Sequence, residues 1–420
     1  MTDKTPPLHA CDDFDPNSLH VDEARKRILD TLNTVSGIEQ LAVRQCLSRV
    51  LAEDIHSTID VPSHTNSAMD GYALQGNEIP VDGTASLDII GRAMAGSPFP
   101  GSVTAGQCVR IMTGAKMPPG ADTVIMQENV TVDGEKITIG SAHKAGQNVR
   151  QAGEDLTTGE RVFSAGKLIT PADLGMLASM GIAEVRMQRR VRVAFFSTGD
   201  ELRSVGQPLG DGQIYDSNRY TLHGMLTRLG VEILDMGVIP DRRELIEQAF
   251  HSAAANADVL ITSGGVSVGE ADFVKETLEK IGEVNFWKIA MKPGRPLAVG
   301  RIGQCQFFGL PGNPVSAMVT FYQFVQPALQ RLSGQTVSPP LLLKAKTTSR
   351  LKKAPGRIDF QRGRLETDEQ GDLVVHSTGQ QGSGMLSSMG KANCFIVLPL
   401  ESKGVEASSL VAVQPFAGLI

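Results

Sequence analysis

Two segments of similar design constrain the fold of this chain more than any other feature. DVLITSGGVSVGEADF (residues 258–273) and GLPGNPVSA (residues 309–317) each join an apolar strand to a helix through a glycine-rich turn. Because strands that lead into helices in this way run parallel in an open α/β sheet, both turns are expected at one edge of a single sheet. The first turn carries carboxylates, and the second offers backbone N–H groups at a helix start. The pair therefore predicts a site for a metal ion and a phosphate.

The bulk composition limits the classes of protein to which the chain can belong. Its 420 residues predict more than one domain, and 41% hydrophobic with 20% charged residues is typical of a soluble globular protein. A net charge of −6 without a basic block argues against a nucleic-acid partner. No apolar run reaches membrane-spanning length, and no signal peptide is evident. Five scattered cysteines without a CxxC pair favour reduced thiols and a cytoplasmic location.

The succession of sequence patterns predicts a multidomain α/β plus β fold. The expected parts are a disordered tail (1–18), a connecting α-containing subdomain (19–55 and 160–189), a β-rich domain (56–159), an α/β domain (190–335) and a C-terminal β-barrel (338–420). Strands and helices alternate from residue 190, which predicts a doubly wound, mostly parallel sheet. Helices are expected to begin near Val21 and at Pro171, and both are assigned to the connecting subdomain. Asp133-Gly134 is expected to supply the turn of a hairpin.

Five loops are expected at the carboxyl ends of the α/β strands, where such folds bind ligands. They are STGDEL (197–202), IPDRRE (239–244), SGGVSVGEAD (263–272), MKPGRP (291–296) and LPGNPVS (310–316). In sequence order they alternate carboxylates with lysine and arginine. Several carboxylates at one edge repel one another unless a cation or proton offsets them, and Mg²⁺ favours carboxylate and phosphate oxygens. Asn313 is expected to cap the last helix and Pro314 to begin it, leaving N–H groups for an anion. Any one of these acids, taken alone, is equally consistent with a simple cap or a solvated loop residue.

Several common active sites are absent from the sequence. SGGVSVG is neither a GxGxxG fingerprint nor a GxxxxGK[ST] loop, which disfavours a Rossmann dehydrogenase and a P-loop NTPase. The chain also lacks a GxSxG elbow, so Ser267 is interpreted as a ligand contact rather than a nucleophile.

Further motifs extend this pattern across most of the chain. They are NSAMDGYA (66–73), IMTGAKMPPGADTVIMQE (111–128), GQNVRQAGEDL (146–156) and PGRIDFQRG (355–363). Together with the α/β loops, and in the same order, they resemble the MoeA and gephyrin E-domain family of molybdopterin molybdenumtransferases from about Val21 onward. The resemblance implies a molybdopterin-binding α/β domain that inserts molybdate into adenylylated molybdopterin, releases AMP and uses Mg²⁺. It also implies an elongated homodimer, with a cleft between the α/β and C-terminal parts of one subunit and the β-rich part of the other.

The same resemblance assigns roles to residues of this chain. The residues implied in catalysis are Asp70, Thr113, Asp155, Glu201, Asp241, Asp272, Lys288 and Lys292. Asp241 and Asp272 are the expected Mg²⁺ ligands, with Glu201 as a third candidate. Lys288, Lys292 and Arg295 would hold phosphates or molybdate. The remaining substrate-binding residues are expected to be Gly264, Gly265, Ser267, Pro311, Asn313 and Pro314, with Ser383 as a candidate from the C-terminal part.

One segment departs from the family pattern, and the sequence is also compatible with two other functions. The family commonly has a Pro-x-aromatic-Asp run before NSAMDGYA, whereas this chain has Pro62-Ser63-His64-Thr65, with His64 interpreted as a surface substitution. One alternative is the preceding step, adenylylation of molybdopterin, against which the NSAMDGYA and GED motifs argue. The other is a non-catalytic molybdopterin-binding scaffold. The expected partners are adenylylated molybdopterin, molybdate, a second copy and other molybdenum-cofactor biosynthesis proteins, with no membrane.

Overall fold

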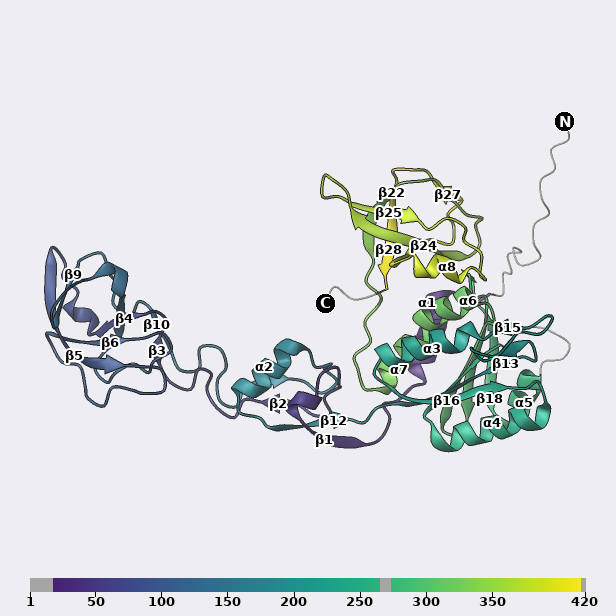
Figure 1. The fold of residues 1–420 in the computed structure, drawn as a ribbon, viewed down its shortest axis with the longest axis horizontal. Coiled ribbons are helices and arrows are strands. Elements are labelled where there is room, and N and C mark those ends of the chain that lie inside the picture. Colours follow the sequence, from purple (N-terminus) through teal and green to yellow (C-terminus); the bar gives the residue numbers. More distant parts are fainter. Residues whose placement is uncertain (1–17, 265–272, 417–420) are drawn as a thin grey trace. The chain divides into compact units, whose positions relative to one another are not determined.

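The computed structural model describes residues 18–264 and 273–416. The chain forms two compact units (Figure 1). Unit 2 spans Gln40–Met187, and unit 1 combines the residues up to Glu39 with those from Gln188 onward. No helix within the described ranges has the length and apolar character that a membrane span requires.

The β-rich part of unit 2 is a six-stranded sheet in the order β7-β4-β6-β5-β9-β8. Its strands are β4 (Gly71–Leu74), β5 (Thr84–Ala93), β6 (Gln107–Ile111), β7 (Thr123–Met126), β8 (Thr131–Asp133) and β9 (Lys136–Gly140). The expected hairpin is β8–β9, in which Asp133 pairs with Lys136. The turn consists of Gly134, with φ +59°, and Glu135. The sequence predicts Asp133 and Gly134 as the turn residues. In the structure Asp133 is instead the last residue of β8.

The second part of unit 2 is built from two separate chain segments around α2 (Pro171–Ser179). The strand pairs are β1 (Ile38–Ala42) with β12 (Glu184–Gln188), β2 (Ile55–His56) with β11 (Arg161–Phe163), and β3 (Asn66–Ser67) with β10 (Val149–Arg150). Helix α2 begins as predicted, with Thr170 as N-cap and Pro171 in the first turn. The Thr170 N–H donates to the Asp173 carboxylate at 2.8 Å, and the Asp173 N–H donates to the Thr170 hydroxyl at 3.4 Å. This reciprocal capping box satisfies N–H groups that a helix start otherwise leaves without partners.

Unit 1 contains the doubly wound sheet, in the order β16-β13-β17-β21-β20-β18. Its strands are β13 (Arg192–Thr198), β16 (Glu232–Ile239), β17 (Val259–Ser263), β18 (Glu283–Lys288), β20 (Pro296–Ile302) and β21 (Cys305–Leu310). The first four strands in sheet order are parallel, and β20 is antiparallel to both of its neighbours, which confirms the mostly parallel sheet. The helices are α1 (Val21–Asp30), α3 (Ser217–Arg228), α4 (Arg243–Asn256), α5 (Phe273–Ile281), α6 (Pro314–Thr320) and α7 (Gln326–Leu332). Apolar side chains of α4 and α5 cover one face, and those of α1, α3, α6 and α7 cover the other.

Helix α1 belongs to unit 1, which differs from the predicted grouping. Its buried residues Val21, Ala24 and Ile28 join the core formed by α7 and the α/β sheet. The sequence prediction placed this helix with α2 in a connecting subdomain, but α2 lies in unit 2. The apolar stripe of α1 is matched by the last helix of the α/β domain, almost three hundred residues away, and local periodicity does not reveal such a partner.

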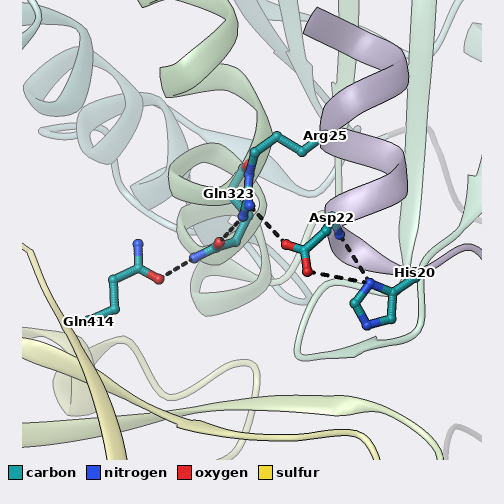
Figure 2. A network of polar contacts seen from close by, with 5 residues as sticks. All are labelled: His20, Asp22, Arg25, Gln323 and Gln414. Atoms are coloured by element: carbon teal, nitrogen blue, oxygen red, sulfur yellow. Dashed lines mark hydrogen bonds and ion pairs between the residues drawn. The ribbon is translucent and has the colours of Figure 1, made fainter. Parts of the chain in front are cut away.

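The last helix of the α/β domain contains a π-helical segment, η4 (Phe321–Val325), between α6 and α7. Residue 327 is a proline and cannot donate the usual helical hydrogen bond to the Gln323 carbonyl. Arg25 of α1 donates to this carbonyl at 3.0 Å and to the Gln323 side-chain oxygen at 2.7 Å (Figure 2). The Gln323 amide in turn donates to Gln414 at 2.9 Å. Asp22 completes the network by accepting from Arg25 at 3.0 Å.

The C-terminal part of unit 1 is a closed five-stranded barrel, as predicted. Its strands are β22 (Leu343–Thr347), β24 (Ile358–Thr367), β25 (Leu373–Ser377), β26 (Cys394–Leu398) and β28 (Leu410–Pro415). The ring closes because β24 pairs with both β25 and β26. A short strand, β19 (Met291–Lys292), leaves the α/β domain and runs parallel to β24. Tyr322 of η4 stacks on Phe416 with ring centroids 5.6 Å apart and lies 5.9 Å from Phe395, so aromatic contacts also join barrel and helix.

Replacement of Arg25 tests the network in Figure 2. We expect Arg25→Ala to destabilise unit 1 by about 2–3 kcal/mol, because the buried oxygen of Gln323 loses its partner. Trp287, the only tryptophan of the chain, lies in β18 and reports unfolding of this unit by its fluorescence in urea. The control Arg27→Ala removes an exposed pair with Glu23 and should cost about 0.5 kcal/mol or less. Equal losses for the two variants would contradict a structural role for the network.

Candidate functional site

Four of the five loops predicted to hold the site follow one edge of the unit 1 sheet, and the fifth, after β17, lies almost wholly outside the described residues. Strands β16, β13, β17 and β21 are parallel, so their carboxyl ends coincide. Because β20 is antiparallel to β21 and β18 is antiparallel to β20, the connection from β18 to β20 lies at the same edge. The loop after β17 runs through residues 265–272. The predicted site residues Gly265, Ser267 and Asp272 therefore lie outside the described residues.

Three carboxylates approach one another where β13 and β16 end. The Asp241 N–H donates to the Asp200 carboxylate at 3.2 Å. The pKa of Asp241 is raised, first by burial and then by the negative charges of Asp200 and Glu201. Gly199 has φ +147°, which side-chain-bearing residues rarely adopt, and an added Cβ there would lie 2.5 Å from the end of the Glu201 side chain. A bound cation would relieve the repulsion among these groups, and an all-oxygen donor set suits Mg²⁺.

The described residues do not by themselves form a complete metal site. Within residues 18–264 and 273–416, no three histidine, cysteine or acidic side chains are grouped closely enough to hold a metal ion. Asp241 and Glu201 thus remain predicted ligands, and Asp272 lies outside these ranges.

The centre of the edge is formed by backbone from two glycine-rich turns. The Gly264 N–H donates to the Leu310 carbonyl at 3.2 Å, and an added Cβ at Gly312 would lie 3.9 Å from the Gly264 Cα. Gly264 has φ +93°, and a Cβ there would lie 3.0 Å from the Thr198 carbonyl oxygen. A side chain at either glycine would fill the space between the turns. The turns thus leave room for a ligand to approach the backbone closely.

The start of α6 differs in two respects from the prediction. Pro314 is the first helical residue, as expected, and follows Pro311 and Asn313 in the same turn. Asn313 occupies the N-cap position, but its side chain makes no capping hydrogen bond, so that part of the prediction is wrong. The Val315 N–H, expected to be free for an anion, donates instead to the Ser383 carbonyl at 3.0 Å. A loop of the barrel thus supplies the acceptor that the cap does not.

Basic side chains gather at the other end of the edge. Lys288 ends β18, Lys292 lies in β19, and the Arg295 carbonyl accepts from the Ile289 N–H at 2.7 Å, which closes this loop. Lys292 pairs in register with Asp359 of the barrel. Burial raises the pKa of Asp359, while a hydrogen bond from Gln361 and the positive charge of Lys292 act in the opposite direction.

Among the described residues of the five loops, the acids and the lysines follow different strands of the sheet, although they alternate in sequence. The acids lie on β13 and β16, the lysines lie on β18 and β19, and the glycine-rich turns follow β17 and β21 between them. At about 4.8 Å per strand, β13 and β18 are roughly 19 Å apart. The predicted mixed rim also includes Glu270 and Asp272 of the loop after β17, which lie outside the described residues, so it stays a prediction. A ligand that used both ends would have to be long.

One barrel residue near this edge, Arg362, was missed by the sequence prediction. Arg362 is fully buried, and burial lowers its pKa to about 10. Its guanidinium donates to the Ser388 hydroxyl and to the Gly382 carbonyl, both at 3.1 Å, and its N–H donates to Gln381 at 2.8 Å. These bonds shape the loop that carries Ser383. The signal available in the sequence was a barrel strand, PGRIDFQRG, with acidic, amide and basic residues where apolar ones are expected.

The predicted residues of unit 2 form a separate set. The Asp70 carboxylate accepts from both the backbone N–H and the hydroxyl of Thr113, each at 2.7 Å. These bonds lower the pKa of Asp70, with the backbone bond as the larger cause. Asp155 is exposed and is held by its N–H, which donates to the Val61 carbonyl at 3.0 Å. His64, in the segment that departs from the family pattern, is half-buried, with its ring 3.1 Å from the Ser63 hydroxyl.

Comparison with known proteins covers nearly the whole chain. Residues 19–181 match the MoeA N-terminal region (domain I and II), residues 194–331 a probable molybdopterin binding domain, and residues 344–416 the MoeA C-terminal region (domain IV). A molybdopterin molybdenumtransferase of Haemophilus influenzae is 48% identical over 404 residues, which cover 96% of this chain and 100% of that protein. The same enzyme of Nostoc sp. is 33% identical and covers 95% of both chains. The crystal structure of a molybdopterin biosynthesis moeA protein from Pyrococcus horikoshii has a TM-score of 0.83 at 29% identity, and covers 95% of this chain and 100% of that one.

The two perturbed aspartates predict opposite pH responses. Because the pKa of Asp241 is raised, its favourable contribution is present below the ordinary pKa of aspartate and is lost as pH rises through the raised value. We expect Asp241→Asn to stabilise unit 1 at pH 7 by up to about 1 kcal/mol after solvent screening, and the gain to disappear near pH 3. The lowered pKa of Asp70 has the opposite sign: its contribution is present at pH 7 and is lost as pH falls through the lowered value. Asp70→Asn should therefore destabilise unit 2 at pH 7.

Hydrogen exchange resolved by peptide measures both changes in one experiment. Asp211→Asn, at an exposed position of unit 1, serves as the matched control and should change neither unit. A gain for Asp211→Asn equal to that for Asp241→Asn would show that net charge, and not the carboxylate cluster, is responsible.

Proposed function

The chain belongs to the MoeA family of molybdopterin molybdenumtransferases, and we propose that it inserts molybdate into adenylylated molybdopterin with Mg²⁺-dependent release of AMP. The family supports a role in molybdenum cofactor biosynthesis. The specific reaction is supported by one observation above all: a sheet edge with carboxylates at one end, lysines at the other and open glycine turns between them. Adenylylated molybdopterin is a long substrate with a pyrophosphate between two organic groups, which suits such an edge.

The acidic end fits a divalent cation. Asp241 and Asp272, with Glu201 as a third candidate, would hold Mg²⁺, which when bound would offset the negative charge of the pyrophosphate. The raised pKa of Asp241 supports this assignment, because its second cause, after burial, is the negative charge of Asp200 and Glu201, which a cation would neutralise.

The remaining groups of the edge bind and orient the substrate. Lys288 and Lys292 act as compact positive charges beside phosphate or molybdate oxygens, with Arg295 near them. Gly264 lets the ligand approach the backbone. We propose that water attacks the phosphoanhydride, so that its P–O–P bond breaks and AMP leaves while molybdopterin keeps its own phosphate. The two thiols of molybdopterin then replace one oxygen of molybdate, which leaves with their two protons as water. Ser383 and its loop cover the α6 end of this path, and no side-chain nucleophile is required.

The location and the assembly are part of the same proposal. The buried free thiols among the described residues, Cys46, Cys108, Cys305 and Cys394, support a reducing cytoplasm. In the homodimer implied by the family resemblance, unit 2 of a second copy would add Asp70, Thr113 and Asp155 to the cleft. The hydrogen bonds that keep Asp70 ionised are consistent with such a role.

Release of AMP from adenylylated molybdopterin tests the reaction directly. Purified protein should release AMP only when molybdate and Mg²⁺ are both present, and the product should reconstitute an apo-molybdoenzyme. Binding without release would favour a scaffold, and formation of adenylylated molybdopterin from ATP by this chain would favour the preceding adenylyltransferase step.

Asp272→Asn tests the metal assignment. We expect AMP release to fall about a hundredfold or more, as is common when a stabiliser of transition-state charge is lost. Asp211→Asn, which lies outside the proposed site, should retain wild-type turnover. Near-normal turnover of Asp272→Asn at saturating Mg²⁺ would remove Asp272 from the set of ligands.

A further inference from the structure

A group of buried polar side chains underlies the glycine turns on the face covered by α3 and α6. Its members are Ser197, Asp216, Asn218 and Ser263, and each is 9% exposed or less. We call them the polar floor. Ser197 and Ser263 end β13 and β17 and lie opposite each other in register. They share a face with Val193, Phe195, Val259 and Ile261, whose side chains pack in the core beneath α3 and α6. Buried polar groups at this depth are normally fully hydrogen-bonded.

Asn218 connects the floor to both glycine turns. Its amide nitrogen donates to the Ser263 hydroxyl and to the Gly312 carbonyl, each at 2.7 Å. Ser263 directly precedes Gly264, so this one side chain fixes the two turns with respect to each other. Asp216, two residues earlier, is the N-cap of α3 and accepts from the Arg219 N–H at 3.1 Å through one carboxylate oxygen.

Three atoms of the floor have no hydrogen-bond partner among the described residues. They are the hydroxyl of Ser197, the second carboxylate oxygen of Asp216 and the amide oxygen of Asn218. Leaving such groups buried and unsatisfied is costly, so a set of three beside a ligand-binding edge points to a partner that arrives with the ligand. Two of the three atoms can only accept hydrogen bonds. The partner must therefore present N–H or O–H donors.

We propose that the polar floor binds the hydrogen-donor groups of the organic part of the substrate, either the amino-pyrimidinone edge of the pterin or the ribose hydroxyls of the adenylate. This inference rests on the proposed function and extends it. The esterified pyrophosphate of the substrate and molybdate carry no donors at neutral pH, and the Asp216 carboxylate repels them. The floor thus selects the organic groups, while the lysines at the other end of the edge hold the anions.

Two substitutions that add no bulk should weaken substrate binding without destabilising the fold. Asp216→Asn keeps an oxygen that can cap α3, because asparagine caps as well as aspartate, but can no longer offer two acceptors. Ser197→Ala removes an unsatisfied buried hydroxyl, which should leave the fold as stable as before or more stable. Both variants should keep the wild-type melting temperature or exceed it. Both should bind adenylylated molybdopterin about tenfold or more weakly.

The matched control is Asp368→Asn, which replaces a barrel carboxylate that also accepts backbone N–H groups, from Gln370 and Asp372. It should bind like the wild type. Calorimetric titration of each protein with adenylylated molybdopterin, AMP alone and pterin alone shows which half of the ligand contacts the polar floor. If the ribose contacts it, the two variants lose affinity for AMP. If the pterin contacts it, they lose affinity for pterin. If both folded variants bind adenylylated molybdopterin within twofold of the wild type, the proposed role of the polar floor is wrong. This holds even where AMP release by the wild type supports the proposed function. Absence of wild-type binding to adenylylated molybdopterin would overturn the proposed function, and this inference with it.

Discussion

The attachment of the barrel to the last helix of the α/β domain is the constraint on which the rest of unit 1 depends. Pro327 interrupts the hydrogen-bond ladder of that helix, the segment before it is π-helical, and Arg25 donates to the Gln323 carbonyl from another helix. Gln323 then bonds to Gln414, and Tyr322 stacks on Phe416. Because the barrel is fixed here, its glycine-rich loop can contact the start of α6 through Ser383. A loosely attached barrel could not supply that contact reproducibly.

The order of strands in the sheet turns an alternating sequence into separated charges. Glu201 and Asp241 follow neighbouring strands, and Lys288 ends β18, about four strand spacings from β13. At the end of the sheet where β13 and β16 finish, burial and then the negative charges of Asp200 and Glu201 raise the pKa of Asp241.

Features with local causes could be predicted from the sequence, and features with distant causes could not. The strand–turn–helix segment at residues 309–317 and the capped start of α2 depend on short-range patterns, and the structure has both. The grouping of α1 was wrong because its partner, α7, is far along the chain. The Asn313 cap was wrong because the barrel provides a competing contact at Val315. Asp216 and Arg362 were missed because their significance lies in burial beside particular neighbours, which no sequence spacing encodes.

The position of α1 in unit 1 also has a consequence for the order of events during synthesis. Unit 2 is an insertion between α1 and the sheet against which α1 packs. On the ribosome, the apolar face of α1 emerges early but has nothing to cover it until α7 has been made. At translation rates of about 5–20 residues per second, that delay lasts for tens of seconds. Unit 2 can fold in that time, whereas α1 must remain exposed, which makes the nascent N-terminus a natural target for chaperones.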